Sequence, residues 1–290
     1  EVYLKTGDLV LAEESIQKAI EIDPSAVSAY LQAGKVNWAK GELEKALDQV
    51  QLAISLDPEN PDNYVFLARL YAEKSNNEKA LELLEKASDC DNATVQTVIE
   101  HANLLNELNG SIAARDLIAS FSQKYPENPE LLMLLAEAEA SCGETDKAEA
   151  VAKKVLNIQP NDKDVHMLLG RILEKNGNLD QAAFYFGQAV AIEPTYIDGY
   201  LKLSQLHIRQ REYSKARRVL EQGIVNSPTD ISLYLSCASL LKEVKDYRGA
   251  ETMLRKASSI EPRNVLIHRQ LGAILALNMV HQSQEVSTQI

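Results

Sequence analysis

This sequence of 290 residues contains no long hydrophobic run and no recognisable leader. Its longest purely apolar stretch, Leu131–Ala136, stops at Glu137, whereas a helix that crosses a bilayer needs about 20 such residues. No segment at the start combines positive charge, an apolar core and small residues in the manner of a secretory signal. We therefore expect a soluble chain, either cytoplasmic or periplasmic, that does not insert directly into a membrane.

Cysteine is scarce too, and its spacing excludes two kinds of stabilised fold. Cys90, Cys142 and Cys237 form an odd set with no CxxC pair, which argues against a disulfide framework and against a structural zinc site. The histidines are widely separated and form no metal-ligand motif. A glycine-rich phosphate loop, HExxH, GxSxG and an EF-hand loop are also missing. We predict no enzyme activity, no metal and no cofactor within these residues.

Positive charge is short in the first half of the chain. The net charge is −12 overall, with −15 in residues 1–145 and +3 in residues 146–290. Because an acidic half repels a phosphate backbone, nucleic acid is not expected as a partner. The asymmetry suggests that the two halves meet differently charged surfaces, and it leaves head-to-tail self-association between copies open.

What the sequence does contain is a period of 34 residues that no insertion or deletion disturbs. Alanine marks one position of the period and proline marks another, with Asn92 at the one proline position that lacks proline. The alanines are Ala12, Ala46, Ala80, Ala114, Ala148, Ala182, Ala216 and Ala250, and the prolines are Pro24, Pro58, Pro126, Pro160, Pro194, Pro228 and Pro262. Such a period indicates one supersecondary unit that is stacked many times.

The segment Val27–Asn60 shows what one unit contains. Apolar residues at helical spacing predict two amphipathic helices, Val27–Lys40 and Glu42–Leu56. Gly41 separates them, because glycine lets the chain leave a helix with positive φ, and Pro58 ends the second helix. The repeated alanine supplies a small side chain where the two helices cross closely.

The unit resembles the tetratricopeptide repeat (TPR) family, in particular bacterial scaffolds that are built from many such repeats. The resemblance rests on Tyr30, Ala33, Gly34, Gly41, Ala46, Ala53 and Pro58 in one unit, and it recurs along the chain. It implies an all-α fold, a right-handed α-solenoid (superhelix) of stacked 34-residue helix-turn-helix repeats. The expected divisions are a partial first repeat at 1–26, seven complete units at 27–60, 61–94, 95–128, 129–162, 163–196, 197–230 and 231–264, an extra first helix at 265–278 and a frayed tail at 279–290. We expect the segment to be a piece of a longer protein.

The resemblance also implies a concave groove lined by the first helix of each unit, in which family members bind partners. The predicted partner-binding groove contains Leu31, Lys35, Trp38, Val65, Arg69, Ile99, Asn103, Met133, Glu137, Met167, Arg171 and Leu201. Two interpretations of its aliphatic positions remain open, packing between units or an apolar floor for a bound peptide. Trp38 is the only tryptophan and the strongest anchor candidate.

Two further interactions can be weighed from the residues. Chaperone-binding members of the family hold a C-terminal carboxylate with an ordered set of Lys, Asn and Arg side chains in three successive units. Lys35, Arg69 and Asn103 occupy groove positions here, but the full set is missing, so a chaperone C-terminal tail is not expected as the partner. A secondary basic patch is either a site for an acidic segment or phosphate, or a solvated helix face. It contains Lys202, Arg209, Arg211, Lys215, Arg217 and Arg218.

These features predict a non-catalytic scaffold that binds a peptide or protein partner in its concave groove. Two alternatives stay open: a substrate-presenting TPR arm of a larger enzyme such as a protein glycosyltransferase, and an assembly factor in bacterial secretion, pilus or exopolysaccharide export. A catalytic domain in the flanking sequence would favour the first alternative, and an upstream signal peptide or lipobox would favour the second.

Overall fold

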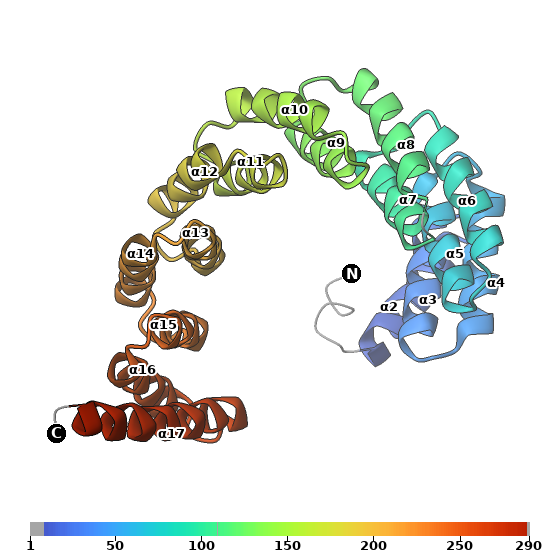
Figure 1. Cartoon of the computed structure of the whole chain (residues 1–290). Coiled ribbons are helices and arrows are strands. Elements are labelled where there is room, and N and C mark those ends of the chain that lie inside the picture. The colour runs from blue at the N-terminus through green and yellow to red at the C-terminus, as the bar shows by residue number, and fades with distance from the viewer. Residues whose placement is uncertain (1–8, 109, 289–290) are drawn as a thin grey trace. The chain divides into compact units, whose positions relative to one another are not determined.

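The computed structural model describes the backbone of residues 9–108 and 110–288 and the side chains as far as Val280. Within these ranges all regular secondary structure is helical, and the helices follow one another through short turns (Figure 1). The all-α fold expected from the sequence is therefore confirmed. The chain divides into two compact units, Glu1–Gly143 and Glu144–Ile290.

Unit 1 is a row of helix pairs that stack in chain order (Figure 1). Within the unit, the first helices α3, α5 and α7 each pack against the second helix that follows, and each second helix packs against the next first helix. The neighbouring first helices α5 and α7 also touch directly. The helices of this unit are α2 (Leu9–Ile22), α3 (Val27–Ala39), α4 (Leu43–Leu56), α5 (Pro61–Glu73), α6 (Asn77–Asp89), α7 (Val95–Glu107), α8 (Ser111–Lys124) and α9 (Pro129–Ser141).

Unit 2 repeats the same arrangement. Its helices again pack with their neighbours in chain order, and the first helices α13 and α15 touch directly. The helices of this unit are α10 (Thr145–Ile158), α11 (Lys163–Lys175), α12 (Leu179–Ile192), α13 (Ile197–Arg209), α14 (Tyr213–Asn226), α15 (Ile231–Glu243), α16 (Tyr247–Ile260) and α17 (Val265–Thr288).

The two ends of the chain differ from the complete pairs. Near the start, α2 is the second helix of the partial repeat that the sequence places at 1–26, and residues 1–8 of that repeat lie outside the described part of the chain. Near the end, α17 continues past Asn278, where the first-helix pattern of the sequence stops, and reaches Thr288. The residues 289–290 of the expected tail lie outside the described part of the chain.

The repeated alanine lies where the two helices of a pair cross. All eight alanines of the series are buried, seven of them with no exposed surface. The opposing helix is close enough that a Cβ added to Gly34 would lie 2.6 Å from Val50 Cγ2, and one added to Gly170 would lie 2.4 Å from Phe186 Cε1. Because protein interiors are packed this tightly, the crossing accepts only small side chains.

The turn within each helix pair uses a left-handed backbone conformation. Gly41 has φ +78°, and Gly143 and Gly177 adopt similar values. The same turn position is occupied by Ser75, Arg211 and Lys245 in other pairs, and these residues also have positive φ, between 59° and 64°. The turn geometry is therefore kept even where the sequence has lost its glycine, at a cost in backbone strain.

Polar caps fix the start of several first helices. The Asn60 side chain accepts a hydrogen bond from Asp62 N at 3.1 Å, and the Asn128 side chain accepts one from Leu131 N at 2.9 Å. Proline follows each of these asparagines at the first helical position, where its missing N–H costs nothing. The start of each of these helices is therefore fixed by an Asn-Pro pair.

Candidate functional site

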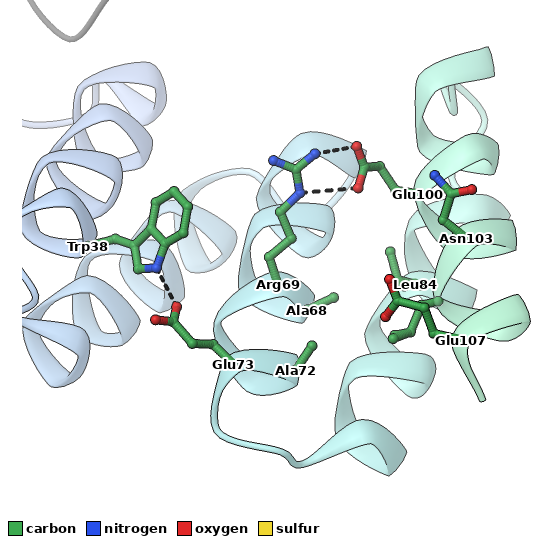
Figure 2. A pocket seen from close by; sticks show the side chains of 10 residues that line it. Trp38, Ala68, Arg69, Ala72, Glu73, Leu84, Glu100, Asn103 and Glu107 are labelled. Atoms are coloured by element: carbon green, nitrogen blue, oxygen red, sulfur yellow. Dashed lines mark hydrogen bonds and ion pairs between the residues drawn. The ribbon is translucent and has the colours of Figure 1, made fainter. Parts of the chain in front are cut away.

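A pocket of about 340 Å³ opens on unit 1 between the first helices α3, α5 and α7, with α6 behind them (Figure 2). Trp38 comes from the last turn of α3, Arg69 and Glu73 from α5, and Glu107 from the end of α7. The lining residues are Trp38, Ala68, Arg69, Ala72, Glu73, Leu84, Glu100, Asn103, Leu104 and Glu107. The pocket combines small and aliphatic side chains with three carboxylates and one guanidinium.

Trp38 forms one wall of the pocket and is held in place from two sides. Its indole ring meets Phe66 edge-to-face, with the ring centroids 5.9 Å apart, a geometry that aromatic pairs favour. Its Nε1–H donates a hydrogen bond to the Glu73 carboxylate on the next first helix (Figure 2). Even so, 42% of the Trp38 surface remains exposed. The ring is therefore oriented by its neighbours and still presented to solvent.

Arg69 and Glu100 form a second bridge across the pocket, between α5 and α7. Arg69 Nε donates to Glu100 Oε2 at 3.2 Å, and Arg69 Nη2 donates to Glu100 Oε1 (Figure 2). Gln96 Nε2 also donates to Glu100 Oε1, at 2.9 Å. A bidentate guanidinium–carboxylate pair of this kind is directional. The positive charge of Arg69 is consequently matched by Glu100 inside the pocket.

Two carboxylates remain once that pair is set aside. Glu73 accepts a hydrogen bond from the Trp38 indole, which carries no charge of its own. Glu107 has no ion-pair partner among the residues that the structure describes, and it lines the pocket together with Leu84 (Figure 2). The pocket therefore carries an excess of negative charge next to apolar walls.

The structure brings together three of the residues that the sequence predicts for a partner-binding groove. Trp38, Arg69 and Asn103 all line the pocket. Leu31 and Met167 are instead buried, with 7% and 3% of their surface exposed, and Leu31 packs in the core with Phe66. For these two residues the packing interpretation applies, since a buried side chain offers no surface to a partner.

The other predicted groove residues are at least partly accessible. Those with half-buried side chains are mostly aliphatic, and those with exposed side chains are polar. The half-buried ones are Lys35, Val65, Ile99, Met133 and Leu201, and the exposed ones are Glu137 and Arg171. Lys35 lies with Nζ 5.9 Å from the Phe66 ring centroid, which places it beside the Trp38 contact.

Sequence reasoning missed the acidic side of the pocket. Glu73 and Glu107 stand one repeat apart, each directly after the position that Trp38 holds in its own repeat. Glu100 stands one turn before the groove position of Asn103. A search for charge that recurs at the 34-residue period on the first helices would have found Glu73 and Glu107 without a structure.

A smaller pocket of about 110 Å³ occupies the corresponding place in unit 2, between α15, α16 and α17. Each of its lining residues stands five repeats after a lining residue of the unit 1 pocket. They are Ala238, Ser239, Lys242, Leu254, Gln270, Ala273 and Ile274. The recurrence shows that the hollow is a property of the repeat, since both pockets use the same positions.

The predicted basic patch is exposed, and three of its six residues form ion pairs. Arg209 pairs with Glu174, Lys215 Nζ lies 2.7 Å from Glu212 Oε1, and Arg217 Nε lies 2.7 Å from Glu221 Oε1. Exposed pairs of this kind contribute little free energy, but they cancel part of the positive charge. All six patch residues (Lys202, Arg209, Arg211, Lys215, Arg217 and Arg218) lie on α13, α14 and the turn between them.

Burial shifts the pKa values of one histidine and two cysteines in directions that favour the neutral forms. Burial lowers the pKa of His101, whose Nδ1 lies 3.0 Å from Ser88 Oγ. It raises the pKa of Cys90 and raises that of Cys237 to about 11. These thiols are protonated at neutral pH and are poor nucleophiles. In the described part of the chain, no cluster of His, Cys, Asp and Glu could hold a metal ion.

No helix among the residues described is both long enough and apolar enough to span a bilayer.

Comparison with protein families assigns the chain. Two family models, both described as tetratricopeptide repeat, match it: one at residues 38–99, 113–172 and 173–240, and the other at residues 1–61. Together they cover most of the sequence. The chain therefore belongs to the tetratricopeptide repeat family, as the repeated alanine, glycine and proline positions predict.

Solved structures of similar fold support the same assignment. A tetratricopeptide repeat protein from Parabacteroides merdae is 18% identical with a TM-score of 0.57, over 86% of this chain and 98% of that one. The C-terminal part of a TPR repeat-containing protein from Cytophaga hutchinsonii is 15% identical with a TM-score of 0.59, over 83% and 99%. A chain of the APC/C hetero-tetramer Cut9–Hcn1 is 17% identical with a TM-score of 0.51, over 93% and 55%. At these identities the likeness concerns the fold, a helical-repeat solenoid. No curated protein matches the sequence.

Proposed function

We propose that this chain is a non-catalytic scaffold that binds a segment of a protein partner on the exposed face of its first helices. The fold of the family suits such a role, because stacked repeats present a long surface on which successive helices contribute equivalent positions. In unit 1 the contact would centre on the pocket around Trp38.

The observation that carries the proposal is the exposure of Trp38 inside that pocket. A tryptophan that is 42% exposed leaves a large apolar surface in water, which is unfavourable for the isolated chain. Aromatic side chains in preformed hollows often supply much of the affinity of a protein interface. Because Phe66 and Glu73 already orient the ring, little side-chain entropy remains to be lost on binding.

A display library of random peptides, selected on the whole chain, tests the proposal. Selected peptides are then titrated against the wild type, Trp38→Ala and Phe184→Ala. Phe184 is a matched control, because it is also an exposed aromatic residue, 58% exposed, but lies on the second helix α12. We expect Trp38→Ala to weaken binding about tenfold or more, which corresponds to about 1.4 kcal/mol, and Phe184→Ala to leave it unchanged.

The two variants must also match the wild type in helicity and melting temperature, measured by circular dichroism. A library that yields no binder, or binders that are indifferent to Trp38→Ala, would refute the proposed binding surface.

A further inference from the structure

We propose that the unit 1 pocket receives an arginine side chain of the partner segment, so that the chain selects basic rather than acidic or neutral peptides. This inference rests on the proposed function and adds the chemistry of the ligand. It follows from the charge of the pocket, the nature of its walls and the position of the tryptophan.

Charge gives the first argument. The pocket holds Glu73, Glu100 and Glu107 against the single cation Arg69. Arg69 and Glu100 satisfy each other in a bidentate pair. Glu73 and Glu107 then confront the cavity without a balancing cation from the pocket lining. A cationic side chain between them would be attracted more strongly than in open solvent, because the apolar walls lower the local dielectric.

The walls give the second argument. Ala68, Ala72, Leu84 and Leu104 provide an apolar surface between the carboxylates. An arginine side chain combines a methylene stem that packs on such a surface with a charged head that stays near polar groups. A small metal ion would gain nothing from these walls. A long basic side chain therefore fits both parts of the pocket.

Trp38 gives the third argument and favours arginine over lysine. A guanidinium is planar, stacks on aromatic faces and binds carboxylates through two parallel hydrogen bonds. Glu73 anchors the indole N–H, and Trp38 lines the pocket with 42% of its surface exposed. The Arg69–Glu100 pair, within the same pocket, shows the guanidinium–carboxylate contact that the ligand would repeat with Glu107.

The counterpart in unit 2 supplies a natural contrast. Lys242 stands there at the position of Ala72, and Gln270 stands at the position of Glu100. Neither change removes the apolar floor, but the first adds a positive charge and the second removes a negative one. The substitution Ala72→Lys therefore transfers the unit 2 chemistry into unit 1, and it should close the pocket to a cation.

The fluorescence of Trp38 provides a local readout, because it is the only tryptophan in the chain. The full chain is titrated with acetyl-Leu-Arg-Leu-amide, with the same peptide carrying citrulline in place of arginine, and with the glutamate version. Citrulline keeps the shape of arginine and lacks its charge. We expect the arginine peptide to perturb the emission and to bind at least about tenfold more tightly than the citrulline peptide. We also expect this preference to shrink at high salt.

Two variants assign the effect to the pocket. Glu107→Gln should lower the affinity for the arginine peptide about tenfold, whereas Glu78→Gln should not. Glu78 is an exposed residue on α6 outside the pocket, so it controls for a change in total charge. Ala72→Lys should abolish the fluorescence response while helicity is unchanged.

Equal affinity for the arginine and citrulline peptides, an unchanged affinity in Glu107→Gln, or no response up to millimolar peptide would overturn the inference. Its failure is separable from failure of the proposed function. If library peptides without basic residues bind in a Trp38-dependent way, the scaffold role stands and only the preference for arginine is wrong.

Discussion

In unit 1, Ala68, Leu84 and Leu104 form the apolar wall of the pocket, and five repeats later Ala238, Leu254 and Ile274 form the same wall in unit 2. The polar positions differ: Arg69, Ala72, Glu100 and Asn103 become Ser239, Lys242, Gln270 and Ala273. The pocket volume is about 340 Å³ in unit 1 and about 110 Å³ in unit 2. A lysine side chain in place of an alanine methyl group accounts for part of the smaller volume.

This difference separates what the fold requires from what it leaves free. Leu84 and Leu254 are almost fully buried, so replacing either would open a cavity between helices. Arg69 and Ser239 are exposed, and exposed positions tolerate most side chains. The repeat thus fixes the walls of each pocket, while the charge at its rim is free to differ between units and to set the partner's chemistry.

At a second pair of equivalent positions, the contact between helices is also kept while the residues that make it differ. The contact between Trp38 and Glu73 in unit 1 corresponds, four repeats later, to the ion pair between Glu174 and Arg209 in unit 2. The carboxylate comes from the later helix in one case and from the earlier helix in the other. Successive first helices therefore meet at this position in both units, and the sequence supplies different partners for the contact.

The largest expected effect tests whether equivalent helix crossings are packed equally tightly in the two units. Ala80→Leu in unit 1 and Ala250→Leu in unit 2 place a large side chain at equivalent helix crossings, which are both fully buried. Overpacking of this kind costs about 1–3 kcal/mol. We expect both variants to lose a similar free energy of unfolding in urea, monitored by circular dichroism.

Exposed residues near each site serve as controls. Glu78→Gln on α6 and Arg248→Gln on α16 change solvent-facing side chains and should leave the unfolding midpoint unchanged. An Ala→Leu variant as stable as the wild type in either unit would show that the helix crossing there is looser than its counterpart.

A smaller effect is expected at the turns. Gly41 and Lys245 occupy equivalent positions with φ values of 78° and 64°. A side chain in this conformation costs about 1–2 kcal/mol, and the smaller freedom of alanine in the unfolded chain offsets about 0.4–1 kcal/mol of that cost. Gly41→Ala should therefore destabilise unit 1 by about 0.5–1 kcal/mol. Lys245→Gly should stabilise unit 2 by about 0.5 kcal/mol, because the greater freedom of glycine in the unfolded chain offsets part of the relief.

Denaturant unfolding of both turn variants at one pH measures these changes. Destabilisation by both substitutions would mean that the lysine side chain contributes more through its contacts than its backbone strain costs.

The sequence predicts the fold well because the positions that define the fold are also the restrictive ones. Ala46 and its successors must be small at the crossings, and the turn after each first helix needs positive φ, so both leave a periodic trace. The site is less predictable. Trp38 is identified by its rarity, but the burial of Met167 depends on how neighbouring helices cover it, which one sequence does not reveal. Glu107 was missed because a helical side chain covers surface toward the preceding turn, so a residue just beyond the expected position reaches the pocket.

The smallest expected effect concerns pH and again compares equivalent positions. His101 in unit 1 and Cys237 in unit 2 stand four repeats apart, and both are buried. Burial is the largest cause of the lowered pKa of His101, which Glu85 and Asp89 oppose. Burial likewise raises the pKa of Cys237 from 9.0 to about 11. The two groups should therefore make stability fall at opposite ends of the pH range.

Below the ordinary histidine pKa of 6.5, the unfolded chain takes up a proton that the buried His101 resists, so the free energy of unfolding falls in acid. Above pH 9 the unfolded Cys237 thiol ionises while the folded thiol does not, and the loss is about 0.4 kcal/mol at pH 9. Urea unfolding across this range for the wild type, His101→Leu and Cys237→Ala measures both terms. His101→Leu should reduce the pH dependence of the free energy of unfolding only in acid, and Cys237→Ala should reduce it only in alkali. Identical profiles for all three proteins would show that neither side chain stays buried in solution.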